Sequence, residues 1–246
     1  MSTISYPFQI FDSLDSTNNY AMGKVREGLW KHSNAAFSYE QTAGKGTRGK
    51  HWQSNKRENI ILSIVADTSF LDLNNKFYLA AITALSCFDL FSKYARESIT
   101  IKWPNDLFWN DRKAAGILIE NAIRGNKWQS SVIGIGMNIN QTLFNNEIIK
   151  PVSLKQITGK TYDILLLAEE LYNCFFERYE SLKRNKFSEI MEEYNLHLFR
   201  RNEISKLKKG PAVFESTIVR VSADGMLHTS DVTERTFDFN EVKWLL

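Results

Sequence analysis

A glycine-rich segment from Gly44 to Lys50 contains the residue types that bind phosphate. Its three glycines let the backbone approach a ligand closely, and Lys45, Arg48 and Lys50 add three positive charges with no acidic residue between them. Trp52 follows and offers a flat ring for stacking. These features suit a phosphate group that carries an aromatic base. They are equally compatible with a flexible basic loop at the surface.

Two nucleotide-binding motifs come close to this segment but do not fit it. Gly44 to Gly49 match the GxGxxG dinucleotide fingerprint, and extending the match to Lys50 gives a near P-loop. Both motifs require a helix directly after the glycines. Residues 51–57 lack helical apolar periodicity, and His51 stands where the P-loop needs Ser or Thr. We therefore expect neither a Rossmann fold nor a P-loop.

A predicted hairpin carries a second group of candidate residues. Lys102 to Asp106 precede its turn, and Arg112 to Glu120 form its returning strand. Lys113 enters that strand just before a run of apolar residues, so its ammonium can point into a cleft and hold anionic oxygens. A lysine at a strand end exposed to solvent fits the same pattern. Asp106 is either a buried hydrogen-bonding carboxylate or a turn residue.

The third candidate segment is the apolar run from Val132 to Asn140. Gly134 and Gly136 allow close approach of a backbone or a ligand to this strand. In an ideal strand Asn138 and Asn140 point the same way, and an inward amide needs a hydrogen-bond partner such as a ligand. The alternative is a strand end that leads into a turn.

The remaining pattern predicts a mixed α and β domain followed by a small β module. Apolar residues make up 43% of the 246 residues and charged residues 24%, which excludes a disordered or fibrous chain. After Phe199 the pattern changes to short strands and turns. The inward positions expected there are Val219, Val221, Leu227 and Phe237. The expected strands and helices are Pro7–Phe11, Asn19–Glu27, Ala35–Glu40, Asn59–Asp67, Asn75–Tyr94, Thr100–Trp103, Asp106–Trp109, Ala114–Ala122, Val132–Asn140 and two helices with apolar stripes at residues 164–175 and 187–198.

Charge, cysteine and histidine usage limit the possible partners. The net charge of +3 is too small to indicate general attraction to nucleic acid or membranes. Cys87 and Cys174 lie in apolar helical stretches, so we expect buried free thiols. The four histidines are far apart, and we expect no protein metal site. With no leader-like segment and no membrane-length apolar run, the expected location is the cytoplasm and no membrane partner is expected.

Taken together, the segments resemble those of the biotin–protein ligases in both order and spacing. The matching segments are Ser16-Thr17-Asn18, Gln41 to Gly49, Lys102 to Asp106, Arg112 to Glu120, and Gly134 to Asn140. The resemblance implies an α+β fold: a mixed-sheet catalytic domain of the class II aminoacyl-tRNA synthetase/biotin ligase-like type over residues 1–199, and a small C-terminal SH3-like β-barrel over residues 200–246.

The resemblance implies a two-step reaction with ATP, Mg²⁺ and biotin. Biotin and ATP would first give biotinoyl-5′-AMP and pyrophosphate. The acyl group would then pass to a lysine of a biotin carboxyl carrier protein, which belongs to acetyl-CoA carboxylase or a related carboxylase. The protein would act as a monomer or a homodimer. The first motif begins by Ser16, which leaves no room in this sequence for the DNA-binding domain of some relatives, so no specific DNA binding is expected.

The resemblance also assigns roles to residues at matching positions. Lys113 would bridge the biotin carboxylate and the α-phosphate, and Asp106 would orient the acceptor lysine or take its proton. The expected biotin-binding residues are Ser16, Thr17, Asn18, Gln41, Lys45, Gly46, Thr47, Lys113 and Gly116. The expected ATP- and adenylate-binding residues are Lys45, Arg48, Trp52, Asn105 and Asn138.

Two other functions fit part of the sequence. A lipoate–protein ligase shares the implied fold and the adenylate chemistry, and the choice between the two acids depends on pocket shape. A non-catalytic nucleotide- or RNA-binding module would use the basic loop and stack bases on Trp52. That module leaves Lys113 and Asn138 without a purpose.

The loop departs from the resembled family at two positions, and this departure yields a prediction. Many members have arginine where this sequence has Lys45 and Thr47; lysine keeps the charge but threonine loses it. We expect Thr47→Arg to slow the release of biotinoyl-AMP, because it restores a cation beside the phosphate. A pulse-chase release assay measures this rate, and equal or faster release from the variant would contradict the expectation.

Overall fold

Two β-sheets and five α-helices make up the regular structure of the computed structural model, which describes residues 5–95, 97–125, 127–144 and 150–246. The first sheet contains β1 (Gln9–Phe11), β2 (Ala35–Ser38), β3 (Ile60–Asp67), β4 (Ile99–Lys102), β5 (Asp106–Trp109), β6 (Arg112–Arg124) and β7 (Lys127–Met137). The helices are α1 (Thr17–Arg26), α2 (Lys76–Ala95), α3 (Leu154–Thr158), α4 (Ile164–Lys183) and α5 (Phe187–Leu196). The second sheet contains β8 (Ile204–Lys209), β9 (Ala212–Val221), β10 (Leu227–Ser230), β11 (Glu234–Phe237) and β12 (Lys243–Trp244).

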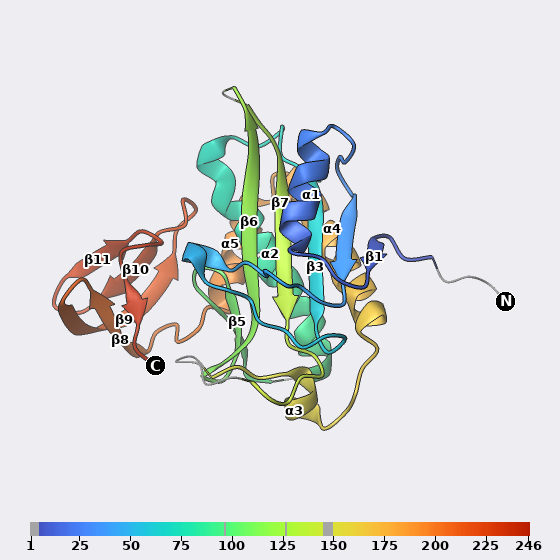
Figure 1. Ribbon diagram of the computed structural model, residues 1–246. Helices are drawn as coiled ribbons and strands as arrows, with labels where there is room; N and C mark the ends of the chain where they lie inside the picture. The colour runs from blue at the N-terminus through green and yellow to red at the C-terminus, as the bar shows by residue number, and fades with distance from the viewer. Residues whose placement is uncertain (1–4, 96, 126, 145–149) are drawn as a thin grey trace.

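The seven-stranded sheet is mixed, which confirms the predicted fold class. Its strand order is β1-β2-β3-β7-β6-β5-β4. The β1–β2 pair is parallel, and the other neighbouring strands are antiparallel. The strands β6 and β7 are the longest and form a central hairpin that extends beyond the rest of the sheet (Figure 1). The predicted absence of a helix after the glycines also holds, since only a 3₁₀ turn at Thr47–Gly49 precedes β3.

The two faces of this sheet have different covers. The helices α2, α4 and α5 lie on one face, while α1 and the segment between β2 and β3 lie on the other (Figure 1). The strand β3 is buried on both faces, as its nearly continuous apolar sequence predicts. The helix α2 is also apolar around most of its circumference and buries twelve of its residues between the sheet and its neighbours α4 and α5.

The helix α1 is fixed in place at its N-terminus. Ser16 caps it by accepting a hydrogen bond from the backbone N–H of Asn19, and Gly28 follows its C-terminus at a φ of 73°. The side chain of Asn18 points into the sheet. A Cβ atom at Gly134 would lie 2.3 Å from Asn18 Oδ1, so only glycine leaves room for this contact. Close approach of α1 to β7 therefore depends on Gly134.

The C-terminal strands form an antiparallel sheet in the order β11-β10-β9-β8-β12. Val221, Leu227 and Phe237 are buried as predicted, but Val219 is 36% exposed and the prediction for it is wrong. The register of β9 against β10 shifts here, because His228 pairs with Arg220 and Thr229 pairs with Ile218. Val219 is the extra residue of this β-bulge, so Ile218 takes the inward position instead. The proposed division into domains at residues 199 and 200 remains a prediction.

Two further expectations need correction. The strand β7 ends at Met137, so Asn138 and Asn140 lie outside it and their predicted shared orientation in a strand does not apply. Asn138 instead donates to the carbonyl of Lys113, and Asn140 donates to the carbonyl of Tyr162. The short helix α3 was not expected, because five residues are too few to show apolar periodicity. It is held by a capping box between Ser153 and Gln156.

The two cysteines are free and buried, as predicted. Both lie in the helical layer, and burial raises the pKa of the Cys87 thiol well above its usual range. Neither thiol is therefore suited to nucleophilic chemistry. Within the described parts of the chain, no helix combines the length and the apolar character needed to cross a membrane.

The contact between Asn18 and Gly134 predicts an effect on stability. We expect Gly134→Ala to destabilise the protein by about 1–3 kcal/mol, because the new methyl group must displace the Asn18 amide. Gly23→Ala in α1 is the matched control, since nothing lies within 4 Å of a Cβ there. This control should be stabilising by about 0.5–1 kcal/mol through helix propensity. Urea denaturation of both variants tests the pair, and equal effects would contradict the account.

Candidate active site

The floor of the candidate site is a row of residues that crosses four strands. Register pairs Lys102 of β4 with Asp106 of β5, Asp106 with Gly116 of β6, and Gly116 with Gly136 of β7. Directly opposed residues in antiparallel strands lie on the same face of a sheet. A cation, a carboxylate and two positions without side chains therefore adjoin on the face that carries α1.

The indole of Trp52 lies directly on the two glycines. A Cβ atom at Gly136 would be 2.3 Å from Trp52 Cε2, and one at Gly116 would be 3.1 Å from Trp52 Cζ3. Trp52 Nε1 is buried and has no hydrogen-bond partner among the described residues. The buried indole N–H of Trp52 therefore lies against Gly136 without a hydrogen-bond acceptor among the described residues.

A β-bulge brings Lys113 over the same floor. Leu107 pairs with Ala115 and Phe108 pairs with Lys113, so Ala114 is the extra residue in β6. A bulge reverses the usual alternation of side chains, and it places Lys113 and Gly116 on one face. The Lys113 ammonium would lie 3.2 Å from a Cβ at Gly116. The segment after residue 149 supports the bulge, because the N–H of Val152 donates to the carbonyl of Lys113.

Lys113 and Asp106 form a half-buried ion pair at 2.7 Å between Nζ and Oδ1. The same ammonium lies 5.8 Å from the centre of the Trp52 ring. The two residues predicted to be catalytic are thus brought together with Gly116 and Trp52. An anionic ligand bound beside this pair would compete with Asp106 for the ammonium of Lys113.

A polar group at the start of α1 forms the other side of the floor. Gln41 Oε1 accepts hydrogen bonds from the backbone N–H of Thr17 at 2.8 Å and from its hydroxyl at 3.0 Å. The Ser63 hydroxyl lies 2.7 Å from Thr17 Oγ1 and 2.6 Å from Asn18 Oδ1. These contacts fix the orientation of the Gln41 amide and leave its two N–H donors free of partners among the described residues.

The motif residues at the start of α1 are buried and bonded to other parts of the protein. Ser16, Thr17 and Asn18 are buried, and Asn18 Nδ2 donates to Glu120 at 2.8 Å. Ser16 caps the helix. These side chains therefore position α1 and Gln41, and their contact with a ligand remains a prediction.

The glycine-rich loop folds back on itself as a short hairpin beside the floor. The N–H of Gly46 donates to the carbonyl of Lys50 at 2.7 Å, and the N–H of Trp52 donates to that of Gly44 at 3.0 Å. Gly44 is required by close approach, since a Cβ there would be 2.5 Å from the carbonyl oxygen of Trp52. Lys45 and Lys50 are exposed, while Thr47 is partly buried within the 3₁₀ turn.

Arg48, at the tip of this loop, contacts the second sheet. It adopts a φ of 61°, its guanidinium donates to the carbonyl of Phe239, and it lies 5.3 Å from the centre of the Phe239 ring. The structure therefore places Arg48 against the C-terminal sheet. The predicted contact of Arg48 with adenylate would require the guanidinium to leave this position.

Asn105 and Asn138 make structural contacts around the floor. Asn105 Nδ2 donates to the carbonyl of Ile117 at 2.8 Å, which holds the β4–β5 turn against β6. Asn138 Nδ2 donates to the carbonyl of Lys113 at 3.3 Å, and its backbone N–H donates to that of Ala114. Both residues thus support the strand that carries Lys113, and their predicted contacts with adenylate stay untested.

Sequence reasoning gave no role to Lys102, although the structure buries it at the end of the floor. Its side chain is 7% exposed, and its ammonium lies 5.1 Å and 5.5 Å from the ring centres of Phe108 and Trp244. The pKa of Lys102 is lowered to about 8, chiefly by burial; attraction to Asp106 opposes this shift, and repulsion from Lys113, Lys50 and Arg48 adds to it. The partner Trp244 comes from β12, and nothing in the sequence spacing indicates that contact.

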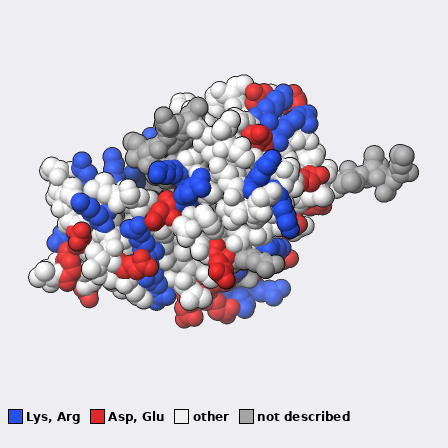
Figure 2. Space-filling view, turned by 90° about the horizontal axis from the view of Figure 1, so that it is seen from below, with Lys and Arg blue, Asp and Glu red and all other residues white. Residues whose placement is uncertain are grey.

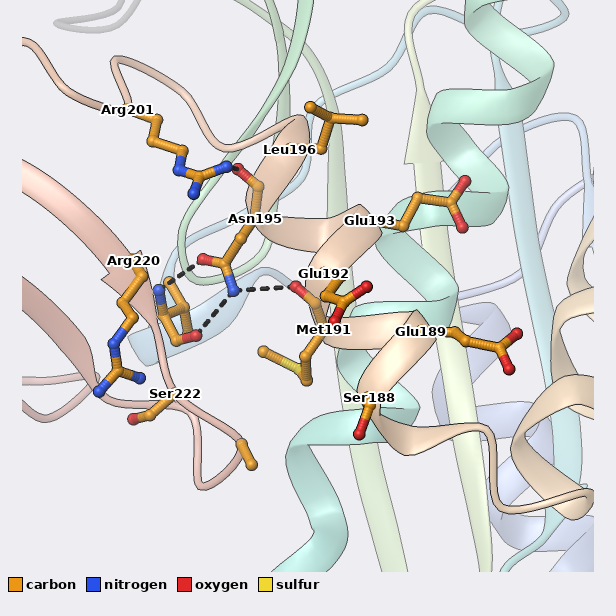
Figure 3. A pocket seen from close by; sticks show the side chains of 12 residues that line it. Ser188, Glu189, Met191, Glu192, Glu193, Asn195, Leu196, Arg201, Arg220 and Ser222 are labelled. Atoms are coloured by element: carbon orange, nitrogen blue, oxygen red, sulfur yellow. Dashed lines mark hydrogen bonds between the residues drawn. The ribbon is translucent and has the colours of Figure 1, made fainter.

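Two hollows in the surface differ in their relation to this floor. One of about 370 Å³ is lined by Gln41, Gly44 and Trp52 and belongs to the candidate site. A larger hollow of about 700 Å³ lies between α5 and β9, where Asn195 bonds the backbone of Met191 and Val221 (Figure 3). No predicted site residue lines this larger hollow, so its size does not mark the chemistry.

Charged groups elsewhere do not extend the basic loop into a broad basic surface on the face that Figure 2 draws. Basic and acidic side chains are interspersed there. Within the described ranges, no three side chains of His, Cys, Asp or Glu gather in a way that could hold a metal ion.

Comparison with known proteins assigns the fold to a family. The profile of the Biotin/lipoate A/B protein ligase family matches residues 10–138, which is more than half of the chain. The chain belongs to this family. The matched region includes α1, the loop, Asp106, Lys113 and the two glycines of β7, so the whole floor described above lies within it.

Individual relatives within the family agree with this assignment. The chain is 30% identical over 154 residues to the bifunctional ligase/repressor BirA of Bacillus spizizenii, covering 61% of this chain and 47% of that protein. It is 31% identical over 156 residues to the biotin–[acetyl-CoA-carboxylase] ligase of Paracoccus denitrificans, covering 61% and 63%. The chain thus spans about half the length of the first of these relatives.

A solved ligase structure has the same fold along nearly the whole chain. It is the biotin protein ligase from Aquifex aeolicus in complex with biotin and ATP. The TM-score is 0.80 at 22% identity, and the match covers 96% of this chain and 97% of that one. Because the match extends over both sheets, the C-terminal sheet belongs to the shared fold.

The burial of Lys102 predicts a pH-dependent stability. The unfolded chain binds its proton more tightly than the folded protein, so the ammonium destabilises the fold below pH 8 and this cost disappears as the pH rises toward 10.5. Lys102→Met should therefore be more stable than the wild type at pH 7, by on the order of 3 kcal/mol. The difference should shrink between pH 8 and 10.5. Denaturation midpoints across this range measure it, and a difference independent of pH would contradict the prediction.

Proposed function

We propose that this protein is an ATP-dependent biotin–protein ligase. It would join biotin to AMP with release of pyrophosphate, and then transfer the biotinoyl group to a lysine of a biotin carboxyl carrier protein. The observation that carries the proposal is the Lys113–Asp106 ion pair beside Gly116 and Gly136, the two glycines on which the Trp52 ring lies. The names of the relatives support biotin as the acid.

The first step must bring two anions together. A carboxylate oxygen of biotin attacks the α-phosphorus of ATP, the bond to the β-phosphate oxygen breaks, and pyrophosphate leaves with the electron pair. Lys113 reduces the repulsion between the carboxylate and the α-phosphate because it is already held over the floor by the bulge at Ala114. Binding of these anions draws the ammonium away from Asp106.

The second step uses the carboxylate of Asp106, which the first step frees from its ion pair with Lys113. Once Lys113 is bound to the adenylate, Asp106 is free to accept a hydrogen bond from the acceptor lysine and to take its proton. The amine attacks the acyl carbon, the bond to the phosphate oxygen breaks, and AMP leaves. In this account Lys113 leaves Asp106 for the adenylate, and Asp106 then contacts the acceptor lysine. The second step can therefore begin only after the first.

The uncharged parts of the substrates fit the remaining groups. The free N–H donors of Gln41 suit the ureido oxygen of biotin, and Thr17 holds that amide in place. Ser16, Thr17 and Asn18 would bind biotin at the same end of the site. Gly116 has no side chain and so leaves room for the Trp52 ring and the Lys113 ammonium beside biotin. Lys45, Gly46, Thr47 and Arg48 would close over the carboxylate and phosphate. Trp52 and Asn138 would bind adenine, and Asn105 would also contact the adenylate.

The proposal includes Mg²⁺, a carrier partner and a location. Mg²⁺ would be bound mainly by the phosphate oxygens of ATP, where it offsets their charge. The partner is the carrier protein or domain of a biotin-dependent carboxylase such as acetyl-CoA carboxylase. The reaction takes place in the cytoplasm.

Pyrophosphate release tests the first step. We expect release from ATP that depends on biotin, and we expect Lys113→Met to reduce kcat/KM at least about 100-fold because the cation between the two anions is lost. Lys127→Met is the control: this exposed lysine is ten residues along β7 from Met137, about 30 Å from the floor. Its rate should equal that of the wild type.

Assays with lipoate and with RNA give the outcomes that would contradict the proposed function. Release that depends on lipoate and not on biotin would identify a lipoate ligase. No release with either acid, together with sequence-independent binding of RNA, would favour a non-catalytic binding module.

A further inference from the structure

Lys102 is a buried cation without a counterion. None of the ion pairs among the described residues includes it, and the carboxylate of its cross-strand neighbour Asp106 is held by Lys113 at 2.7 Å. The rings of Phe108 and Trp244 flank its ammonium and offset part of the cost of burial without neutralising the charge. Because the buried ammonium has no ion-pair partner, binding of an anionic ligand next to it would be favourable.

The charge around Lys102 indicates the kind of anion. Lys113, Lys50 and Arg48 act on it electrostatically, so four cations face the single carboxylate of Asp106. A single carboxylate ligand would leave most of this charge unmatched. A chain of phosphates carries several negative charges and matches it much better.

The position of Lys102 indicates which phosphates it meets. Lys113 lies over Gly116, where the reacting carboxylate and α-phosphate are placed in the proposed reaction. Lys102 is two strands further along the same row, about 10 Å between backbones. A phosphate chain that leaves Lys113 in the direction of β4 therefore reaches Lys102 with its outer phosphates.

We propose that Lys102 binds the β- and γ-phosphates of ATP, and the pyrophosphate that leaves. Lys102 is then a phosphate-binding residue of the site, and the C-terminal sheet contributes to it through Trp244, whose ring centre lies 5.5 Å from the ammonium. The inference rests on the proposed function, since it takes ATP as the substrate.

The test compares inhibition by two products on the full chain. Lys102→Met keeps the length of the side chain and removes the charge, and an apolar group at a buried unpaired position preserves the fold. We expect inhibition of the first half-reaction by pyrophosphate to weaken about 10- to 100-fold in this variant. Inhibition by AMP and the KM for biotin should be unchanged, because neither ligand has a β-phosphate. Lys127→Met should match the wild type throughout.

Two outcomes would overturn the inference while leaving the proposed function intact. Either inhibition by pyrophosphate is unchanged in Lys102→Met, or inhibition by pyrophosphate and by AMP weakens to the same extent, as a purely structural role would produce. If the wild type releases no pyrophosphate with biotin, the proposed function fails. Calorimetric binding of inorganic pyrophosphate to the wild type and to Lys102→Met then decides the inference separately: equal affinity, or no binding to either, overturns it.

Discussion

The ion pair between Lys113 and Asp106 is the interaction around which the rest of the structure is arranged. It lies over Gly116 in the middle of a sheet, where side chains would normally fill the space. The pair reaches this place because one extra residue, Ala114, turns the lysine onto the face that carries the floor. The helices α2, α4 and α5 cover the far face of the sheet that carries both residues.

The two ends of the chain contribute to the floor in different ways. At the N-terminal end, Ser63 and Glu120 hold Asn18, and Thr17 holds Gln41, so that one amide faces the ligand with fixed orientation. At the C-terminal end, Trp244 flanks Lys102 and Phe239 binds Arg48. The second sheet therefore completes the electrostatic environment of the first, and its contacts with Lys102 and Arg48 couple the two sheets at the site.

Much of this arrangement could be predicted from the sequence, because it depends on local patterns. The mixed helix and strand content, the lack of a helix after Gly49 and the burial of Cys87 follow from periodicity and composition, whereas the α+β class is implied by the family resemblance. The orientation of Val219 and the end of β7 could not be predicted, since a bulge and a strand end depend on the partner strand. Lys102 and Trp244 are 142 positions apart in the sequence, and they meet because the two sheets pack together. Local residue spacing cannot predict such a contact.

The central claim is that this floor activates biotin for transfer to a protein lysine. The most direct measurement is the intact mass of a purified biotin carboxyl carrier domain after incubation with the protein, biotin and MgATP. The account predicts the mass gain of one biotinoyl group, which requires both biotin and ATP and is absent when the acceptor lysine is replaced by arginine. No mass gain, or a gain with lipoate in place of biotin, would contradict it.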